Sequence, residues 1–99
     1  MLLRIGAVKE NRHTGYRDEM SMDGQLTSLI TVEGLKDIVE WIENRSYIDG
    51  SVYIKVMLQS QANGGCKGYI KPYKNRTALK QIVDDINRSV QDRYGNIIY

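Results

Sequence analysis

The chain has 99 residues, a formal net charge of +2 and a single cysteine, Cys66. A chain of this length buries about two-thirds of the surface that its unfolded form exposes, so one domain without metals or disulfides is expected. The lone cysteine fits a cytoplasmic location. No apolar run approaches the ~20 residues of a membrane-spanning helix, and Arg4 and Lys9 interrupt any signal peptide, so no membrane association is expected. The small charge excess gives little long-range attraction for nucleic acid.

The first third of the chain is expected to contain a strand followed by a long polar segment. Alternating apolar residues predict a strand over residues 2–9, with Leu3 and Ile5 on one side. Residues 10–24 are polar and contain turn signals, so they form either an exposed loop or a β-hairpin arm. Residues 25–30 are a candidate for a further short strand.

Two amphipathic helices are predicted from apolar residues spaced three and four apart. The first begins near Thr31, whose hydroxyl group can cap it, and continues to Glu43 with an acidic outer face. The second begins after the capping residue Asn75 and ends where Gly95 can adopt a left-handed conformation. The apolar tail over residues 96–99 is a candidate for a short final strand.

Residues 51–61 and 66–73 alternate without a break and predict a β-hairpin. A two-residue loop at Asn63-Gly64 would pair Leu58 with Tyr69 and place the hairpin lysines on the apolar side. A three-residue loop over 63–65 pairs Leu58 with Ile70 and keeps every lysine on the other face, so this register is predicted. Pro72 lacks a backbone donor, which predicts a strand end or a sheet edge there.

These elements predict a single α+β domain over residues 1–99, with an antiparallel or mixed sheet and both helices packed on one face. A ferredoxin-like βαββαβ order is the simplest closure. An α+β meander, in which residues 10–24 supply extra strands, is the alternative. The predicted core consists of Leu3, Ile5, Leu35, Ile38, Ile42, Val52, Ile54, Val56, Leu58, Ile70, Leu79, Ile82, Val83, Ile86 and Val90.

The predicted register leaves one sheet face open and gives it aromatic and basic character. Tyrosine rings can stack on bases while lysines contact phosphates, so this face predicts binding of single-stranded nucleic acid. The same face, with Met57 at its centre, also suits a protein interface. The chain would then be an inhibitor, adaptor or regulatory subunit acting through this face or an edge strand, and a homodimer or larger assembly is expected. The site residues are Tyr53, Lys55, Lys67, Tyr69, Lys71 and Tyr73.

The sequence predicts no catalytic site, cofactor or metal. His13 is alone in a polar turn, and Cys66 has no base near it in the sequence. Asp84 and Asp85 are adjacent, so on a helix their carboxylates point about 100° apart and cannot share a proton. Asn63-Gly64-Gly65 lacks the lysine of a phosphate-binding loop. A non-catalytic binding module is therefore expected.

Overall fold

The structure is a computed structural model that describes residues 2–26, 28–59 and 66–91. The fold begins with an antiparallel hairpin. Strand β1 (Leu2–Asn11) turns directly into β2 (Arg17–Gln25), which pairs back along it from Leu2–Gln25 to Glu10–Arg17. Gly15 makes this turn possible because its φ angle of 74° lies in the left-handed region. Residues 10–24 therefore form a hairpin arm, which is the second of the two predicted alternatives.

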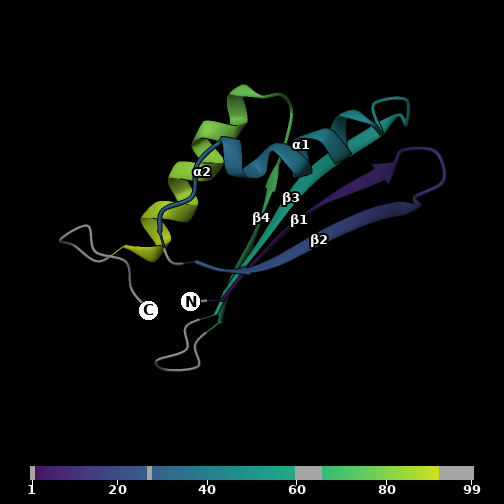
Figure 1. Cartoon of the computed structure of the whole chain (residues 1–99). Coiled ribbons are helices and arrows are strands. Elements are labelled where there is room, and N and C mark those ends of the chain that lie inside the picture. The colour runs from purple at the N-terminus through teal and green to yellow at the C-terminus, as the bar shows by residue number, and fades with distance from the viewer. Residues whose placement is uncertain (1, 27, 60–65, 92–99) are drawn as a thin grey trace.

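The remaining elements complete a ββαββα order. A short 3-10 helix (Glu33–Leu35) leads into α1 (Lys36–Glu43), followed by β3 (Gly50–Gln59), β4 (Cys66–Pro72) and α2 (Thr77–Val90). The four strands form one antiparallel sheet in the order β2-β1-β3-β4 (Figure 1). The ferredoxin-like order is wrong because the second strand pairs with the first before any helix is reached. β4 lies at a sheet edge and ends at Pro72, as predicted.

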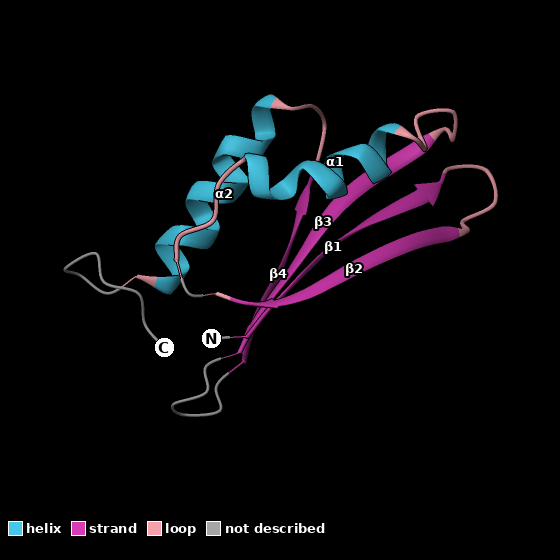
Figure 2. Ribbon diagram, in the orientation of Figure 1, coloured by secondary structure: helices cyan, strands magenta, loops and turns pink. Residues whose placement is uncertain are grey.

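Both helices lie over the same face of the sheet (Figure 2). The apolar stripes of α1 and α2 join Ile5, Ala7 and the buried residues of β3 in a single core cluster. Of the predicted core, Leu3 and Val52 are partly buried, and Ile70 is exposed. Core residues that the sequence analysis did not name are Ala7, Leu26, Val39 and Tyr73.

The predicted capping residues act at the helix starts. The Thr31 hydroxyl accepts a hydrogen bond from the Gly34 amide at 3.3 Å, although the first turn there is 3-10 rather than α. The Asn75 carboxamide oxygen accepts from the Thr77 amide at 3.1 Å. Residues 28–30 form no strand. The predicted Gly95 terminus, the strand over 96–99 and the loop over 63–65 lie outside the described residues.

The predicted register of the β3–β4 hairpin is wrong. Leu58 lies opposite Lys67, and Val56 lies opposite Tyr69. Residues directly opposite in an antiparallel pair share a face, and a shift by one residue reverses the faces of a whole strand. Lys67, Tyr69 and Lys71 therefore point to the helix side, whereas Ile70 lies opposite Lys55 on the other face and is 61% exposed.

Candidate functional site

The structure divides the six predicted site residues between the two faces of the sheet. Tyr53 and Lys55 alternate with the buried residues of β3 and lie on the uncovered face. The other four lie on the helix side, because β4 has the reversed register and Tyr73 continues it, with its amide donating to the Val52 carbonyl. The prediction that all six share one open face is wrong. The residues on the helix side are Lys67, Tyr69, Lys71 and Tyr73.

The edge position of β4 explains how lysines are tolerated on the helix side. Lysine can bury its aliphatic stem and keep its ammonium group in water. Lys71 does this beside α2, where its Nζ atom lies 3.5 Å from an Asp85 carboxylate oxygen. Tyr69 packs against the core cluster between the two lysines. Tyr73 is itself in the core, so it cannot stack on a base.

The uncovered face, called the open sheet face below, has an apolar half and a charged half. The apolar half belongs to β3 and β4, where Met57 is 43% exposed and Ile70 lies across from Lys55. Val8 lies opposite Tyr53 and is buried although the core cluster does not include it. The charged half belongs to β1 and β2. The open sheet face includes Arg4, Gly6, Val8, Glu10, Arg17, Glu19, Ser21, Asp23, Tyr53, Lys55, Met57, Gly68 and Ile70.

Each of the three cations on the open sheet face has a carboxylate partner. Arg4 Nε lies 2.7 Å from Asp23 Oδ1, and this hydrogen bond lowers the pKa of the Asp23 carboxyl group and raises that of Arg4. Arg17 Nη2 lies 3.3 Å from a Glu10 oxygen. Lys55 Nζ lies 3.6 Å from Glu19. The charges of this face therefore sum to zero.

A shallow groove of about 890 Å³ crosses the open sheet face. Gly6 and Gly68 are among its lining residues, together with Met57 and Ile70. At Gly6 the neighbouring strand β2 comes so close that a β-carbon would lie 2.1 Å from the Met20 carbonyl oxygen. The absence of side chains at the two glycines leaves the sheet surface hollow between its flanking residues.

A second hollow, called the β4–α2 hollow below, lies on the helix side. It has a volume of about 350 Å³. Burial, and then the nearby Asp85 carboxylate, raise the pKa of the Tyr69 hydroxyl group to about 12. This hydroxyl oxygen is buried and has no hydrogen-bond partner among the described residues. The hollow is lined by Lys67, Tyr69, Lys71, Asp85, Arg88 and Ser89.

The ends of the two helices meet beside Tyr73. Arg76, next to the start of α2, binds a Glu43 oxygen at the end of α1 through two nitrogens, at 2.7 and 2.9 Å. This pairing raises the pKa of the Arg76 guanidinium. Burial, and then the Glu43 carboxylate, raise the pKa of the Tyr73 hydroxyl group, with Arg76 acting in the opposite direction. This contact joins the helices and has the geometry of a structural ion pair.

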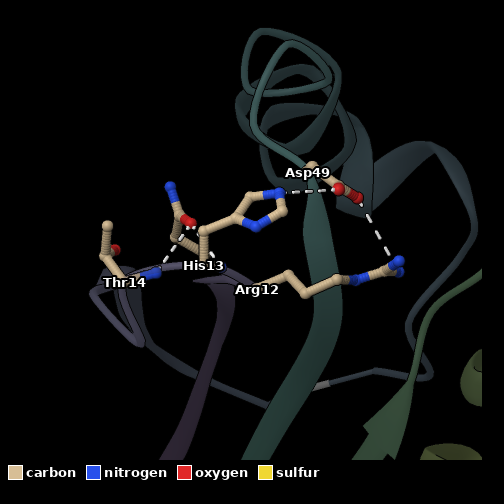
Figure 3. A network of polar contacts seen from close by, with 5 residues as sticks. Arg12, His13, Thr14 and Asp49 are labelled. Carbon is tan, nitrogen blue, oxygen red and sulfur yellow. Dashed lines mark hydrogen bonds and ion pairs between the residues drawn. The ribbon is translucent and has the colours of Figure 1, made fainter.

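His13 lies in a polar network at the β1–β2 turn (Figure 3). Its Nε2 atom is 3.2 Å from Asp49 Oδ2, and Arg12 lies 3.7 Å from the other oxygen of the same carboxylate. The Asn11 carboxamide oxygen accepts from the amides of His13 and Thr14 and shapes the turn. The His13 side chain is 73% exposed, which agrees with the prediction of a loop histidine and adds Asp49 as its partner.

Sequence reasoning missed two sets of residues at these surfaces. Ile70 was assigned to the core because the hairpin register was wrong by an odd number of residues. Asp85 was considered only as the neighbour of Asp84, and Arg88 was not named as a site residue. The three-residue spacing of Asp85 and Arg88 places them on one side of α2. Which side chains of β4 face them depends on the register of the β3–β4 hairpin.

No protein-family model matches the chain, and the searches of curated proteins and of solved structures returned no significant similarity. Within the described ranges, no group of three or more His, Cys, Asp or Glu side chains is arranged to hold a metal ion. No helix among the described residues is long and apolar enough to cross a membrane.

Proposed function

We propose that this protein is a small, non-catalytic protein-interaction module, and that its open sheet face binds a second copy of the chain. The observation that supports this most directly is the pairing of charges on that face. Arg4, Arg17 and Lys55 each have a carboxylate partner, while Met57 and Ile70 are left exposed. An exposed apolar patch rimmed by polar groups is typical of a protein interface.

The same pairing disfavours nucleic acid on this face. A phosphate backbone is held by cations that release counterions to bind it. Here Arg4 is already bound to Asp23 through two nitrogens, at 2.7 and 3.2 Å, and the Asp23, Glu19 and Glu10 carboxylates would repel phosphates. Tyr53 is the one tyrosine of the predicted site that faces this side. The predicted combination of stacked tyrosines and free lysines is therefore not assembled on the open sheet face.

A second copy suits this face because its charges are balanced. In a two-fold dimer the same patch meets itself, so a surface with one sign of charge would repel its copy. With three cations and three carboxylates on each copy, charged groups of one copy can face groups of the opposite sign on the other copy. The apolar half around Met57 and Ile70 can then lose water on both copies.

The face suits self-association better than the sheet edges do. Edge strands of soluble proteins are commonly protected from pairing by charged residues and proline. β4 carries Lys67, Lys71 and Pro72, and β2 carries Asp18, Glu19 and Asp23. Addition of a strand at either edge would bring these groups against the new chain. Stacking on the open sheet face leaves Lys67 and Lys71 on the helix side and keeps Glu19 and Asp23 in their pairs with Lys55 and Arg4.

Sedimentation equilibrium tests this proposal. The wild-type chain should show a concentration-dependent mass approaching twice 11.4 kDa. Ile70→Asp should remain monomeric, because it places an unpaired charge in the apolar half. Tyr47→Asp is the matched control, since Tyr47 is 82% exposed and lies outside the open sheet face. A wild-type monomer at high micromolar concentration, or equal dissociation by both variants, would refute the proposal.

Nucleic acid binding is tested in parallel with a random single-stranded oligonucleotide at two salt concentrations. We expect the Lys55→Gln variant to behave like wild type, because Lys55 is already paired with Glu19. Binding to single strands weakens with salt with a log–log slope of about −0.7 per phosphate contact. Salt-sensitive binding that is lost in Lys55→Gln would show that this face binds nucleic acid instead of a second copy of the chain.

A further inference from the structure

The β4–α2 hollow brings together side chains that are far apart in the sequence. Lys67, Tyr69 and Lys71 come from alternate positions of β4, and Arg88 comes from the last turn of α2. The hollow of about 350 Å³ lies on the helix side of the sheet, away from the apolar half of the open sheet face. Its volume is at the lower end of the range for small-ligand sites, about 300–1,000 Å³.

The hollow contains more positive charge than its own carboxylate can neutralise. Three cations, Lys67, Lys71 and Arg88, share it with Asp85 alone. Lys67 makes no ion pair with any residue that the structure describes. Two positive charges are therefore unbalanced, in contrast to the neutral open sheet face.

The two cations beside Asp85 are loosely held. Lys71 Nζ is 3.5 Å and Arg88 Nη1 is 3.9 Å from an Asp85 oxygen. Charge-assisted hydrogen bonds are normally about 2.7–2.9 Å. The Arg76–Glu43 pair, next to the start of α2, reaches 2.7 Å. Asp85 Oδ1 already accepts a hydrogen bond from Gln81 at 3.0 Å, so it is not committed to the cations of the hollow.

Tyr69 provides a second, independent sign of an incomplete site. Its hydroxyl oxygen is buried and has no hydrogen-bond partner among the described residues, although its side chain forms part of the wall. Buried polar groups are nearly always hydrogen-bonded, and exceptions call for an explanation such as an absent ion or water. The raised pKa of this hydroxyl group keeps its proton in place, so it can serve only as a neutral donor or acceptor at ordinary pH.

We propose that the β4–α2 hollow binds the phosphoryl group of a small phosphate monoester. A monoester is close to a dianion at neutral pH, which matches the two unbalanced charges. The Arg88 guanidinium and the ammonium groups of Lys67 and Lys71 are the donors that phosphoryl oxygens bind best. A carboxylate ligand would neutralise only one of the two charges. The site is a single hollow rather than a track of cations, so it suits one phosphoryl group instead of a polynucleotide backbone.

Titrations followed by amide chemical shifts at fixed ionic strength test this site. The probes are inorganic phosphate, adenosine 5′-monophosphate, a 5′-phosphorylated oligonucleotide and the same oligonucleotide without the phosphate, with adenosine as the uncharged control. We expect shifts over residues 67–71 and 85–89 with every phosphate monoester. A mononucleotide that binds like the phosphorylated oligonucleotide identifies a free metabolite, and tighter binding of the oligonucleotide identifies a polynucleotide end.

Matched charge variants make the test specific to the hollow. Lys67→Gln combined with Arg88→Gln should weaken phosphate monoester binding at least tenfold and leave the fold unchanged, because both side chains are exposed. Lys80→Gln, an exposed lysine of α2 that does not line the hollow, should have less than a twofold effect. Equal weakening by Lys80→Gln, shifts without localisation to the hollow, or no binding at millimolar phosphate would overturn the proposal.

Discussion

At the scale of single residues, the face of the sheet on which Tyr69 lies determines the surroundings of its hydroxyl group. On an open face its hydroxyl group would be hydrated, and the ring would be free to stack. On the helix side it lies beside the Asp85 carboxylate with a buried, unpartnered oxygen, and its pKa is raised to about 12. The burial removes the water that would stabilise a phenolate.

An alkaline titration should reveal this environment. We expect one tyrosine to ionise near pH 12, measured by tyrosinate absorbance, and Tyr69→Phe to abolish that step. Because the pKa in the folded state is above the ordinary value of about 10, the contribution of Tyr69 to stability is complete below pH 10. It is lost as the pH rises through about 12. A wild-type chain in which every accessible and buried tyrosine titrates near pH 10 would contradict this placement.

The same variant tests whether the Tyr69 hydroxyl group lacks a partner. Removal of an unpaired buried polar group is nearly neutral or stabilising, so Tyr69→Phe should change the free energy of unfolding by less than about 0.5 kcal/mol at neutral pH. Chemical denaturation measures this directly. A loss of about 1 kcal/mol or more would show that the hydroxyl group makes a hydrogen bond in the folded protein.

Gly6 is fixed by the close approach of β2. A β-carbon there would lie 2.1 Å from the Met20 carbonyl oxygen, which is backbone and cannot move aside cheaply. Gly6→Ala should therefore cost about 1–3 kcal/mol in denaturant unfolding, as overpacking does. Gly24→Ala is the matched control, because nothing lies within 4 Å of its β-carbon position. If the two variants are equally stable, β1 and β2 are not in this register at Gly6.

At the scale of elements, the register of β4 is the feature on which the site depends. It places Ile70 on the open sheet face, whereas Ile54 of β3 lies in the core. Ile54→Ala should lose about 2–5 kcal/mol of unfolding free energy. Ile70→Ala should lose less than about 0.5 kcal/mol when measured on the monomer, since its side chain is already in water. A loss of about 2–5 kcal/mol in Ile70→Ala would show that Ile70 is in the core and that the lysines lie on the open side, as in the register predicted from the sequence.

Periodicity and capping were sufficient to predict β1, β3, β4 and the two helices, but not β2 or the pairing of the strands. The apolar spacing of α1, α2 and β3 reports which side of each element is buried, and the capping groups of Thr31 and Asn75 mark the helix starts. Those signals are local, so a single sequence carries them. The assignment of both helices to one sheet face followed because each helix has one apolar stripe.

The pairing of β4 could not be predicted in the same way. Cys66–Pro72 contains one strong apolar residue, Ile70, so the alternation alone directs that residue inward. At a sheet edge the opposite orientation is possible. The lysine side chains can extend beside α2 into solvent, and Tyr69 can pack against the core in place of Ile70. Edge position depends on the order β2-β1-β3-β4, which is a property of the whole sheet. The site prediction failed at the same point, because four of its six residues moved with the strand.

At the scale of the whole molecule, the fold has one layer of helices and one uncovered sheet. Its extents are 45 × 26 × 18 Å, and the shortest leaves room for one sheet and one helix layer. Every described helix lies on the same side of the sheet (Figure 2). The open sheet face is therefore the side of the sheet that no described helix covers, and its charges are already neutralised by pairing within the chain.

This arrangement separates two proposed roles by location. Self-association belongs to the open sheet face, and phosphate binding belongs to the β4–α2 hollow on the helix side. Ile70→Asp should abolish the dimer without weakening phosphate monoester binding, because Ile70 does not line the hollow. Comparison of phosphate affinity in this variant and in the wild type checks the independence. A matched loss of both would mean that the dimer builds the phosphate site.

Isotope-filtered nuclear Overhauser spectroscopy on a mixture of labelled and unlabelled chains tests the open sheet face as a self-association surface most directly. We predict intermolecular contacts from the Met57 methyl group to the Ile70 and Tyr53 side chains of the other copy, and none from Tyr47, which lies outside the face. Intermolecular contacts confined to the β2 or β4 edges, or a sample that shows none at millimolar concentration, would contradict the proposed interface.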